Sequence, residues 1–329
     1  MSLPFYEQLL ALDGPLIQGF LVLFFALLLA RLAPLPQAFQ PLAWLSHLAK
    51  SLAAKVKRGD RDEKQQLIAG SLAILLLVLP FWLIITFLLE LAAFPWFFEF
   101  LILYLCLNDA CFIQEAEEIY QALRRGDKPA ARELLSPWVA RDTAELSETG
   151  IAKATIEKLV TTPIHGTVTV VFFFCLAGAP MVLLVRMLKQ LEQSWWCLDP
   201  QYRFFGRPVF LVNQVLLYIP AQLWRFTLAI QGGPQALKLL WQTPHSRFPI
   251  GFNFQVATTA AYVLMTELGG PQKYSGIKVQ VEKMGPGPVP DHKTIPKAIS
   301  LTFRTFAIWF AFVVLLPLIW VLLRYSQTL

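Results

Sequence analysis

Residues 71–89 read SLAILLLVLPFWLIITFLL, a run without a single charged side chain. A helix needs about 20 predominantly apolar residues to cross the hydrocarbon core of a bilayer. A second uncharged run of this kind covers residues 305–323. Charged residues make up only 15% of the chain, whereas soluble domains contain about 25%. The sequence therefore predicts an all-α, polytopic integral membrane protein, with residues 1–329 as one membrane domain.

Four weaker apolar segments accompany these two runs, namely Leu16–Ala30, Phe94–Leu107, Gly166–Val185 and Val209–Ile230. Phe94–Leu107 is short and contains Glu99, and Val209–Ile230 contains several polar side chains, which are costly where they face lipid. We therefore expect four to six membrane segments in all. A re-entrant path for Gly166–Val185 remains open, because basic residues lie on both sides of it.

Basic residues are distributed unevenly along the chain. No Lys or Arg precedes Arg31, whereas 34–66 is rich in both. Cytoplasmic loops of membrane proteins carry such an excess. We expect 34–66 to be a basic cytoplasmic loop or interfacial helix, the N-terminus to be periplasmic, and the protein to lie in the bacterial inner membrane. The net charge of +6 fits attraction to anionic lipid headgroups, and a nucleic-acid-binding pattern is absent.

Helix start and stop signals divide the polar stretch 108–162. Gly126 follows two arginines as a stop, Asp127 begins a second helix, and Ser147 begins a third. These signals predict a helical cytoplasmic insert. Residues 231–297 are rich in Gly and Pro and are predicted to be a polar region with regular structure only at Phe254–Leu268.

Several polar motifs lie between residues 138 and 276. Arg141, Asp142 and Thr143 stand at a turn between two predicted helices, where the guanidinium can bind phosphate and Asp142 can orient it or coordinate Mg²⁺. A helix cap with a surface ion pair is the alternative. His165 can act as a general base, or it can hydrogen-bond a carbonyl at the start of a membrane helix.

Two later motifs complete the set. The segment QYRFFG at 201–206 contains Arg203, which can bind phosphate or anchor the chain at the membrane interface. The segment LGGPQKYSG at 268–276 contains a Gly-Gly-Pro turn, which can bring backbone N–H groups close to an anion. A purely structural turn is the alternative there.

This order of motifs resembles the CobD/CbiB family of cobalamin-synthesis membrane proteins over roughly residues 67–325. The family pattern E-x-x-x-E-N-x-x-D-G corresponds here to Glu157, Thr161, Thr162, His165 and Gly166. The pattern N-T-L-D-S-M corresponds to 189–194, with Lys189 for the Asn and an acid kept at Glu192. Paired aspartates ahead of N-Y-x-P-A-R correspond to Asn213 and Gln214, and the Arg of that motif to Gln222.

The resemblance implies an adenosylcobinamide-phosphate synthase. Such an enzyme is an ATP-dependent C–N ligase that joins aminopropanol, or its phosphate, to adenosylcobyric acid, with ATP and Mg²⁺ as cofactors. Glu157 and His165 are then expected to be catalytic, and Asp142 and Glu192 to bind the metal. The residues expected to bind substrate or phosphate are Arg141, Thr143, Tyr202, Arg203, His245, Gly269, Gly270 and Tyr274.

A non-catalytic regulatory or signalling membrane protein on the same scaffold is the alternative. The ampicillin-resistance regulatory membrane protein is such a relative of the family. The replacement of acidic positions by amides, Thr and His favours this hypothesis, because a divalent cation loses its ligands. It implies no cofactor, and membrane proteins as partners in place of the corrinoid. A transporter is disfavoured, since most polar candidates lie in predicted loops.

Overall fold

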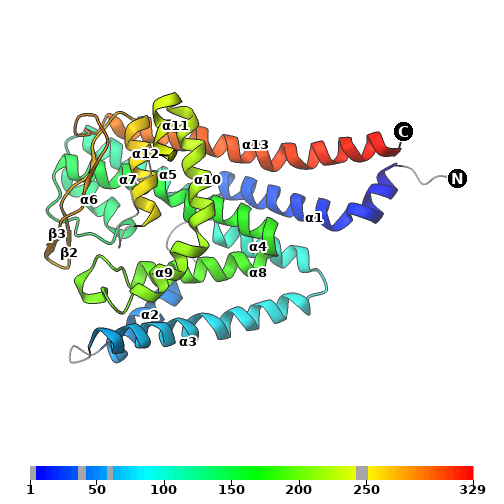
Figure 1. Ribbon diagram of the computed structural model, residues 1–329, viewed down its shortest axis with the longest axis horizontal. Helices are drawn as coiled ribbons and strands as arrows, with labels where there is room; N and C mark the ends of the chain where they lie inside the picture. The colour runs from blue at the N-terminus through cyan, green and yellow to red at the C-terminus, as the bar shows by residue number, and fades with distance from the viewer. Residues whose placement is uncertain (1–4, 36–41, 58–61, 108, 242–250, 329) are drawn as a thin grey trace.

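The computed structural model describes residues 5–35, 42–57, 62–107, 109–241 and 251–328 (Figure 1). Helices dominate this part of the chain, which confirms the all-α membrane class. The α-helices are α1 (Phe5–Leu32), α2 (Ala43–Val56), α3 (Glu63–Glu90), α4 (Pro95–Cys106), α5 (Asp109–Arg124), α6 (Lys128–Leu135), α7 (Glu148–His165), α8 (Thr167–Ser194), α9 (Arg207–Leu216), α10 (Tyr218–Gln231), α11 (Gly233–Trp241), α12 (Phe252–Val263) and α13 (Thr294–Thr328). Two short 3₁₀ turns, η2 (Ser136–Trp138) and η3 (Pro200–Tyr202), and four short strands complete it.

Within the described residues, five helical stretches are long and apolar enough to cross a membrane: Asp13–Leu32, Glu63–Glu90, Pro95–Arg124, Glu148–Ser194 and Thr294–Ser326. Five lies within the predicted range of four to six. The prediction that Val209–Ile230 forms a membrane segment is wrong, because the chain leaves helical geometry at Leu217 and continues as two short helices, α9 and α10. In Figure 1, α10 runs across the direction of α13 rather than along it.

Helices α1 and α13 lie side by side along the long axis of the molecule (Figure 1), with charged side chains at both ends of the pair. At one end the Arg31 guanidinium lies 3.7 Å from the centre of the Phe306 ring. At the other end Arg324 Nε donates to Asp13 Oδ2 at 3.0 Å. Residues 305–323 between these ends carry no charge and rise about 29 Å as a helix. That length matches the hydrocarbon core of about 30 Å.

Helix α8 is broken at its centre and folds back on itself. Ala177 and Gly178 have non-helical backbone angles, with Gly178 at φ 75° and ψ −174°. Arg186 Nη1 donates a hydrogen bond to the carbonyl oxygen of His165, 21 residues earlier. In one continuous helix these positions would lie about 30 Å apart. Gly166–Val185 is therefore a re-entrant hairpin, with both of its ends on the side of α7.

The start and stop signals of 108–162 are confirmed. Gly126 adopts φ +79° after α5, the left-handed conformation that ends many helices. The Asp127 side chain accepts from the backbone N–H of Ala130 at 3.1 Å, and Ser147 caps Gly150 at 3.1 Å. Helices α5, α6 and α7 bury a shared apolar core that includes Phe112, Ile119, Leu135, Ile151 and Ile156.

The Gly/Pro-rich region 231–297 contains more regular structure than predicted. Helix α12 corresponds to the predicted segment Phe254–Leu268 but ends at Val263. Beyond it, β1 (Leu268–Gly269) pairs with β4 (Lys283–Met284), and β2 (Gln272–Tyr274) pairs with β3 (Ile277–Val279), both antiparallel. Strands this short give no alternating pattern that a sequence reader can detect.

Helix α2, within the predicted basic segment 34–66, packs onto α8. Leu45, Ala49 and Ala53 are buried, and the Trp195 indole donates to the Ala49 carbonyl at 3.1 Å. The Gln190 amide donates to the Ser46 hydroxyl at 2.6 Å. Helix α2 therefore closes one side of the space between α7 and the returning limb of α8.

Candidate functional site

A cavity of about 600 Å³ lies between α7 and the returning limb of α8. Helix α2, residues 136–141, the start of α12 and the strands after it close the remaining sides. Its lining on α7 is one helical face, with Ala154, Glu157, Lys158, Thr161, Thr162 and His165. Its lining on α8 is likewise one face, with Arg186, Lys189, Gln190, Gln193 and Ser194. Spacings of three and four residues place such side chains on one side of a helix.

The lining of this cavity is strongly positive. Of the described residues that line it, five are Lys or Arg: Lys50, Arg141, Lys158, Arg186 and Lys189. Glu157 is the sole carboxylate in that set, and His47 and His165 add two imidazoles. A cavity with this charge attracts anionic ligands, and its partly desolvated cations interact with them more strongly than they would in water.

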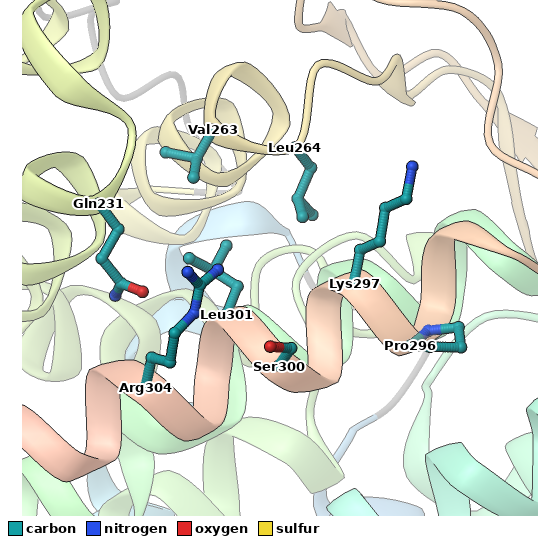
Figure 2. Close-up of a pocket in the computed structure, with 8 residues that line it drawn as sticks. All are labelled: Gln231, Val263, Leu264, Pro296, Lys297, Ser300, Leu301 and Arg304. Carbon is teal, nitrogen blue, oxygen red and sulfur yellow. The ribbon is translucent and has the colours of Figure 1, made fainter.

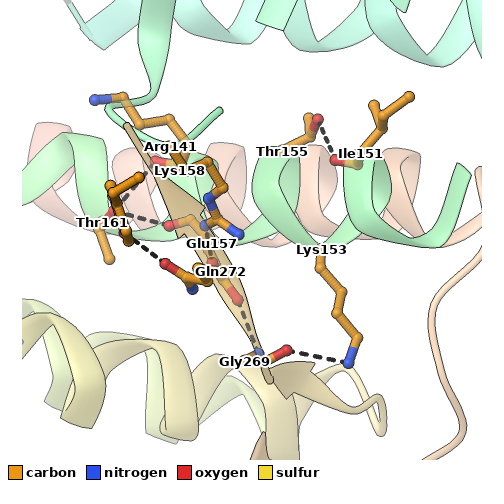
Figure 3. A network of polar contacts seen from close by, with 10 residues as sticks. Arg141, Ile151, Lys153, Thr155, Glu157, Lys158, Thr161, Gly269 and Gln272 are labelled. Atoms are coloured by element: carbon orange, nitrogen blue, oxygen red, sulfur yellow. Dashed lines mark hydrogen bonds and ion pairs between the residues drawn. The ribbon is translucent and has the colours of Figure 1, made fainter. Parts of the chain in front are cut away.

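Glu157 connects three segments that are distant in the sequence (Figure 3). Its carboxylate pairs with the Arg141 guanidinium, and it accepts the backbone N–H of Gly269 at 2.8 Å. Burial opposes the charge of Arg141, but the Glu157 carboxylate and the Tyr274 phenol outweigh this effect and raise the pKa of Arg141. The Gly-Gly-Pro turn thus brings an N–H group to an anion, as the motif predicts, and that anion is the protein's own carboxylate.

Tyr274 lies at the edge of the cavity and is buried. Its hydroxyl donates to Gln272 Oε1 at 2.6 Å. Burial raises the pKa of the phenol, and the opposing charge of Arg141 does not reverse that effect. Tyr274 therefore remains a neutral hydrogen-bond donor at neutral pH. Gly270, in the same turn, adopts φ +98°. A Cβ atom added at this position would lie 3.9 Å from the Lys153 ammonium.

Asp142 and Thr143 lie beside the β2–β3 hairpin and do not line the cavity. The Asp142 backbone N–H donates to the Lys273 carbonyl at 2.8 Å, and its carboxylate accepts the N–H of Gly276 at 2.8 Å. The Thr143 carbonyl accepts the N–H of Leu146 at 3.1 Å. Asp142 therefore holds the turn of the β2–β3 hairpin, next to the cavity, and does not line the cavity itself.

Glu192 is buried behind the cavity wall. Its carboxylate accepts from Lys189 at 3.0 Å and from the Asn213 amide at 2.6 Å. Asn213 also donates to the Leu188 carbonyl at 3.2 Å, so this amide ties α9 to α8. Gln214 likewise ties α9 to α12, because its side chain accepts the backbone N–H of Phe252 at 3.0 Å.

Two further predicted residues lie away from the cavity, and one is not described. Tyr202 belongs to η3 and its ring lies 4.5 Å from the Lys57 ammonium. Arg203 is exposed, 5.5 Å from the Phe204 ring centre. His245 lies outside the described residues. The structure thus brings Arg141, Glu157, His165 and Tyr274 together at the cavity, with Gly269 directly behind Glu157.

A second hollow of about 450 Å³ lies between α12 and α13, away from these residues (Figure 2). Lys297, Ser300 and Arg304 follow one another along α13, and Val263 and Leu264 face them from α12 (Figure 2). Lys297 and Arg304 are exposed side chains. This hollow shares no lining residue with the cavity between α7 and α8.

Comparison with known proteins identifies the family of the chain. The family described as "CobD/Cbib protein" matches residues 23–302. The chain belongs to the CobD/CbiB family. A cobalamin biosynthesis protein CobD of Chromobacterium violaceum is 31% identical over 289 residues, 87% of this chain and 93% of that protein. A CobD protein of Stutzerimonas stutzeri is 30% identical over 88% of this chain and 95% of its own length.

More distant CobD/CbiB proteins show the same relationship. Cobalamin biosynthesis protein CbiB of Salmonella typhimurium is 26% identical over 256 residues, 74% of this chain and 80% of that protein. No solved structure is significantly similar to the chain. The chain is thus a multi-pass membrane protein of a cobalamin-biosynthesis family, which implies a corrinoid substrate and a lipid bilayer as its surroundings.

Sequence reasoning missed the importance of three basic residues at this CobD/CbiB cavity: Lys158, Arg186 and Lys189. A usable signal exists, because charged residues within or beside apolar segments are costly and commonly mark functional positions. In the sequence, Arg186 and Lys189 belong to the basic residues around Gly166–Val185 that make the path of this segment ambiguous, and Lys189 also replaces the Asn of a family motif. The re-entrant path of α8 removes that ambiguity, since both residues return to the side of α7.

Asp142 and Glu192, which were expected to bind the metal, and Glu157, which was expected to be catalytic, belong to three separate networks. Asp142 holds the hairpin turn, Glu157 pairs with Arg141, and Glu192 pairs with Lys189. Throughout the described ranges, His, Cys, Asp and Glu form no cluster of three that could hold a metal ion. The donor set of the cavity therefore does not fit a preformed Mg²⁺ cage, which requires several oxygen ligands.

Proposed function

We propose that this protein catalyses the amide-forming step of the adenosylcobinamide-phosphate synthase type. In that step the amine of an amino alcohol, or of its phosphate, is joined to a carboxylate of adenosylcobyric acid. ATP is the expected source of energy, because a carboxylate does not form an amide with an amine spontaneously in water. One observation carries the proposal: Arg141, Glu157, His165 and Tyr274, from three separate segments, meet in one cavity.

The cavity residues suit such a reaction in three ways. His165 Nδ1 is buried and has no hydrogen-bond partner among the described residues, so it can accept a proton from the attacking amine. The Glu157–Arg141 pair ties α7, which carries this imidazole, to the loop at Arg141, and Glu157 also holds the N–H of Gly269. Positive side chains around the space stabilise the anionic reactants. Any Mg²⁺ would enter with the nucleotide phosphates, since Mg²⁺ binds readily to substrate phosphates.

We also propose that the protein lies in the bacterial inner membrane with its N-terminus in the periplasm. The re-entrant path of α8 supports this orientation. It places the basic residues after α8 at the same end of the molecule as those between α5 and α6, including Arg125, Lys128, Arg203 and Arg207. A concentration of Lys and Arg on one side is typical of the cytoplasmic face.

Purified protein tests the function directly. We expect protein in detergent to convert adenosylcobyric acid, ATP and aminopropanol or its phosphate into the corresponding cobinamide, detected by mass spectrometry. We expect His165→Ala to lower kcat by about 100-fold or more, the contribution typical of a general base.

Growth of a corrinoid auxotroph on cobyric acid provides a second measurement in cells. Normal expression and membrane insertion without any product, in vitro or in cells, would contradict the proposal. That result would favour the alternative hypothesis of a non-catalytic regulatory protein, which the replacement of acidic residues also supports.

A further inference from the structure

The protein balances the positive charges of the cavity only in part. Among the described residues, the Lys158 ammonium has no ion-pair or hydrogen-bond partner, although it is largely enclosed. Figure 3 shows its side chain extending away from the Arg141–Glu157 pair, so this carboxylate does not neutralise it. An enclosed cation without a counter-charge is unfavourable, and its presence points to an anion supplied from outside the chain.

Arg186 presents a second cation to the same space. It is only 6% exposed. One guanidinium nitrogen donates to the His165 carbonyl, and the Cys106 thiol and the buried Asp109 carboxylate lie close enough to act on its charge. Its Nε nevertheless has no hydrogen-bond partner within the described part of the chain. A guanidinium can donate in two parallel directions, so this side chain retains capacity for an oxyanion.

Lys189 is the third member of the group. It donates to Glu192 at 3.0 Å, but that carboxylate is shared with the Asn213 amide. Lys189 lies one helical turn from Arg186 on the returning limb of α8, and both face α7. Lys158, Arg186, Lys189 and His165 all line the same cavity, so the three positive charges lie around the imidazole. Thr162 Oγ1, on the α7 wall of the cavity, also has no hydrogen-bond partner among the described residues.

We propose that Lys158, Arg186 and Lys189 bind the phosphate monoester of the amino-alcohol substrate directly, without a metal ion. This inference rests on the proposed function and assigns these three residues to the phosphate group of its substrate. A phosphate monoester carries a charge of about −1.5 to −2 at neutral pH. The unpaired Lys158, the free Nε–H of Arg186 and Lys189, whose carboxylate partner is shared, can meet that charge, whereas the same cations repel a free divalent ion. The arrangement places the phosphate beside His165, so the amine of a short amino alcohol lies within reach of the imidazole.

Calorimetric titration of the intact protein in detergent tests this site. The probes are 1-amino-2-propanol phosphate and unphosphorylated 1-amino-2-propanol, each with EDTA and with Mg²⁺. We expect the phosphate to bind equally well under both conditions and the free alcohol to bind much more weakly. We expect Lys158→Met and Lys189→Met each to weaken phosphate binding by about tenfold or more, the effect of losing one charge-assisted hydrogen bond.

Lys297→Met is the matched control, because Lys297 lies in the basic hollow of Figure 2, outside the cavity. It should bind the phosphate as the wild type does. Lys158→Arg, which keeps the charge, should retain most of the binding and guards against misfolding of Lys158→Met. Binding that requires Mg²⁺, or equal affinity for the free alcohol, would overturn the inference. So would unchanged binding by both Met variants.

The outcomes also separate this inference from the proposed function. Protein that binds the phosphate as described but forms no cobinamide product would refute the ligase and leave the phosphate site standing. Protein that forms product, with the same KM for aminopropanol phosphate in wild type and Lys158→Met, would refute the phosphate site and leave the ligase standing.

Discussion

Replacement of Glu157 by alanine is expected to abolish product formation and to lower the free energy of unfolding by about 3–5 kcal/mol. The carboxylate holds Arg141 and the N–H of Gly269, and the paired side chains are only 13% and 12% exposed. Without Glu157, the Arg141 charge is left unpaired in a cavity that already contains four other Lys or Arg side chains. The Gly269 turn and the strands that follow it also lose their attachment to α7.

Glu148→Ala is the matched control for this change. Glu148 lies in the first turn of α7, and its carboxylate lies 2.9 Å from Nδ1 of His292 in a pair whose side chains are 38% and 25% exposed, far more than those of Glu157 and Arg141. Exposed ion pairs contribute about 1 kcal/mol or less. Denaturant unfolding, together with the cobinamide assay, compares the two variants. Equal stability of Glu157→Ala and Glu148→Ala, with full activity in both, would show that the Glu157 network does not hold the site together.

Replacement of Gly178 by valine is expected to eliminate phosphate binding and product formation while the outer helices stay intact. Gly178 has φ 75° and ψ −174°, a backbone region that is essentially restricted to glycine. A residue forced into such a conformation costs about 1–3 kcal/mol, and a β-branched residue tolerates positive φ especially poorly. Straightening of the turn would move Arg186 and Lys189 away from Lys158, and the cavity would lose one of its two walls.

Gly14→Ala controls for the loss of a glycine inside a membrane helix. Gly14 lies in α1, and no heavy atom lies within 4 Å of the Cβ that a larger residue would carry. Its replacement should be neutral, or stabilise by about 0.5–1 kcal/mol. Titration with aminopropanol phosphate and circular dichroism of both variants provide the comparison. Normal phosphate binding by Gly178→Val would mean that the turn does not position the α8 limb.

Much of the fold could be predicted because some signals are local. The uncharged runs 71–89 and 305–323 are sufficient for membrane helices, and Asp127 and Ser147 start helices through their own side chains. Other features depend on tertiary contacts. The break at Leu217 and the short strands near Gly269 leave no periodic pattern in the sequence. The sequence therefore predicted a membrane segment where two short helices lie, and it did not predict the paired strands.

The candidate site was predictable only in part, and for a similar reason. The resemblance to the CobD/CbiB family, with the motifs that carry it, singled out Arg141, Glu157, His165 and Tyr274, and these do meet at the cavity. Spacing cannot tell which way a side chain points, so Asp142 and Arg203 received site roles although neither lines the cavity. Lys158 escaped notice because its significance depends on its having no ion-pair partner among the described residues, which becomes visible only once α8 folds back.

Side-specific cysteine labelling tests the re-entrant path of α8 most directly, in protein whose four native cysteines have been replaced. Exposed reporter positions are Ala93 between α3 and α4, Lys128 after α5, and Gln201 after α8. A membrane-impermeant maleimide should label Lys128→Cys and Gln201→Cys from one side of the membrane and Ala93→Cys from the other. Labelling of Gln201→Cys from the same side as Ala93→Cys would show that α8 crosses completely, and the cavity with its cationic wall would not exist.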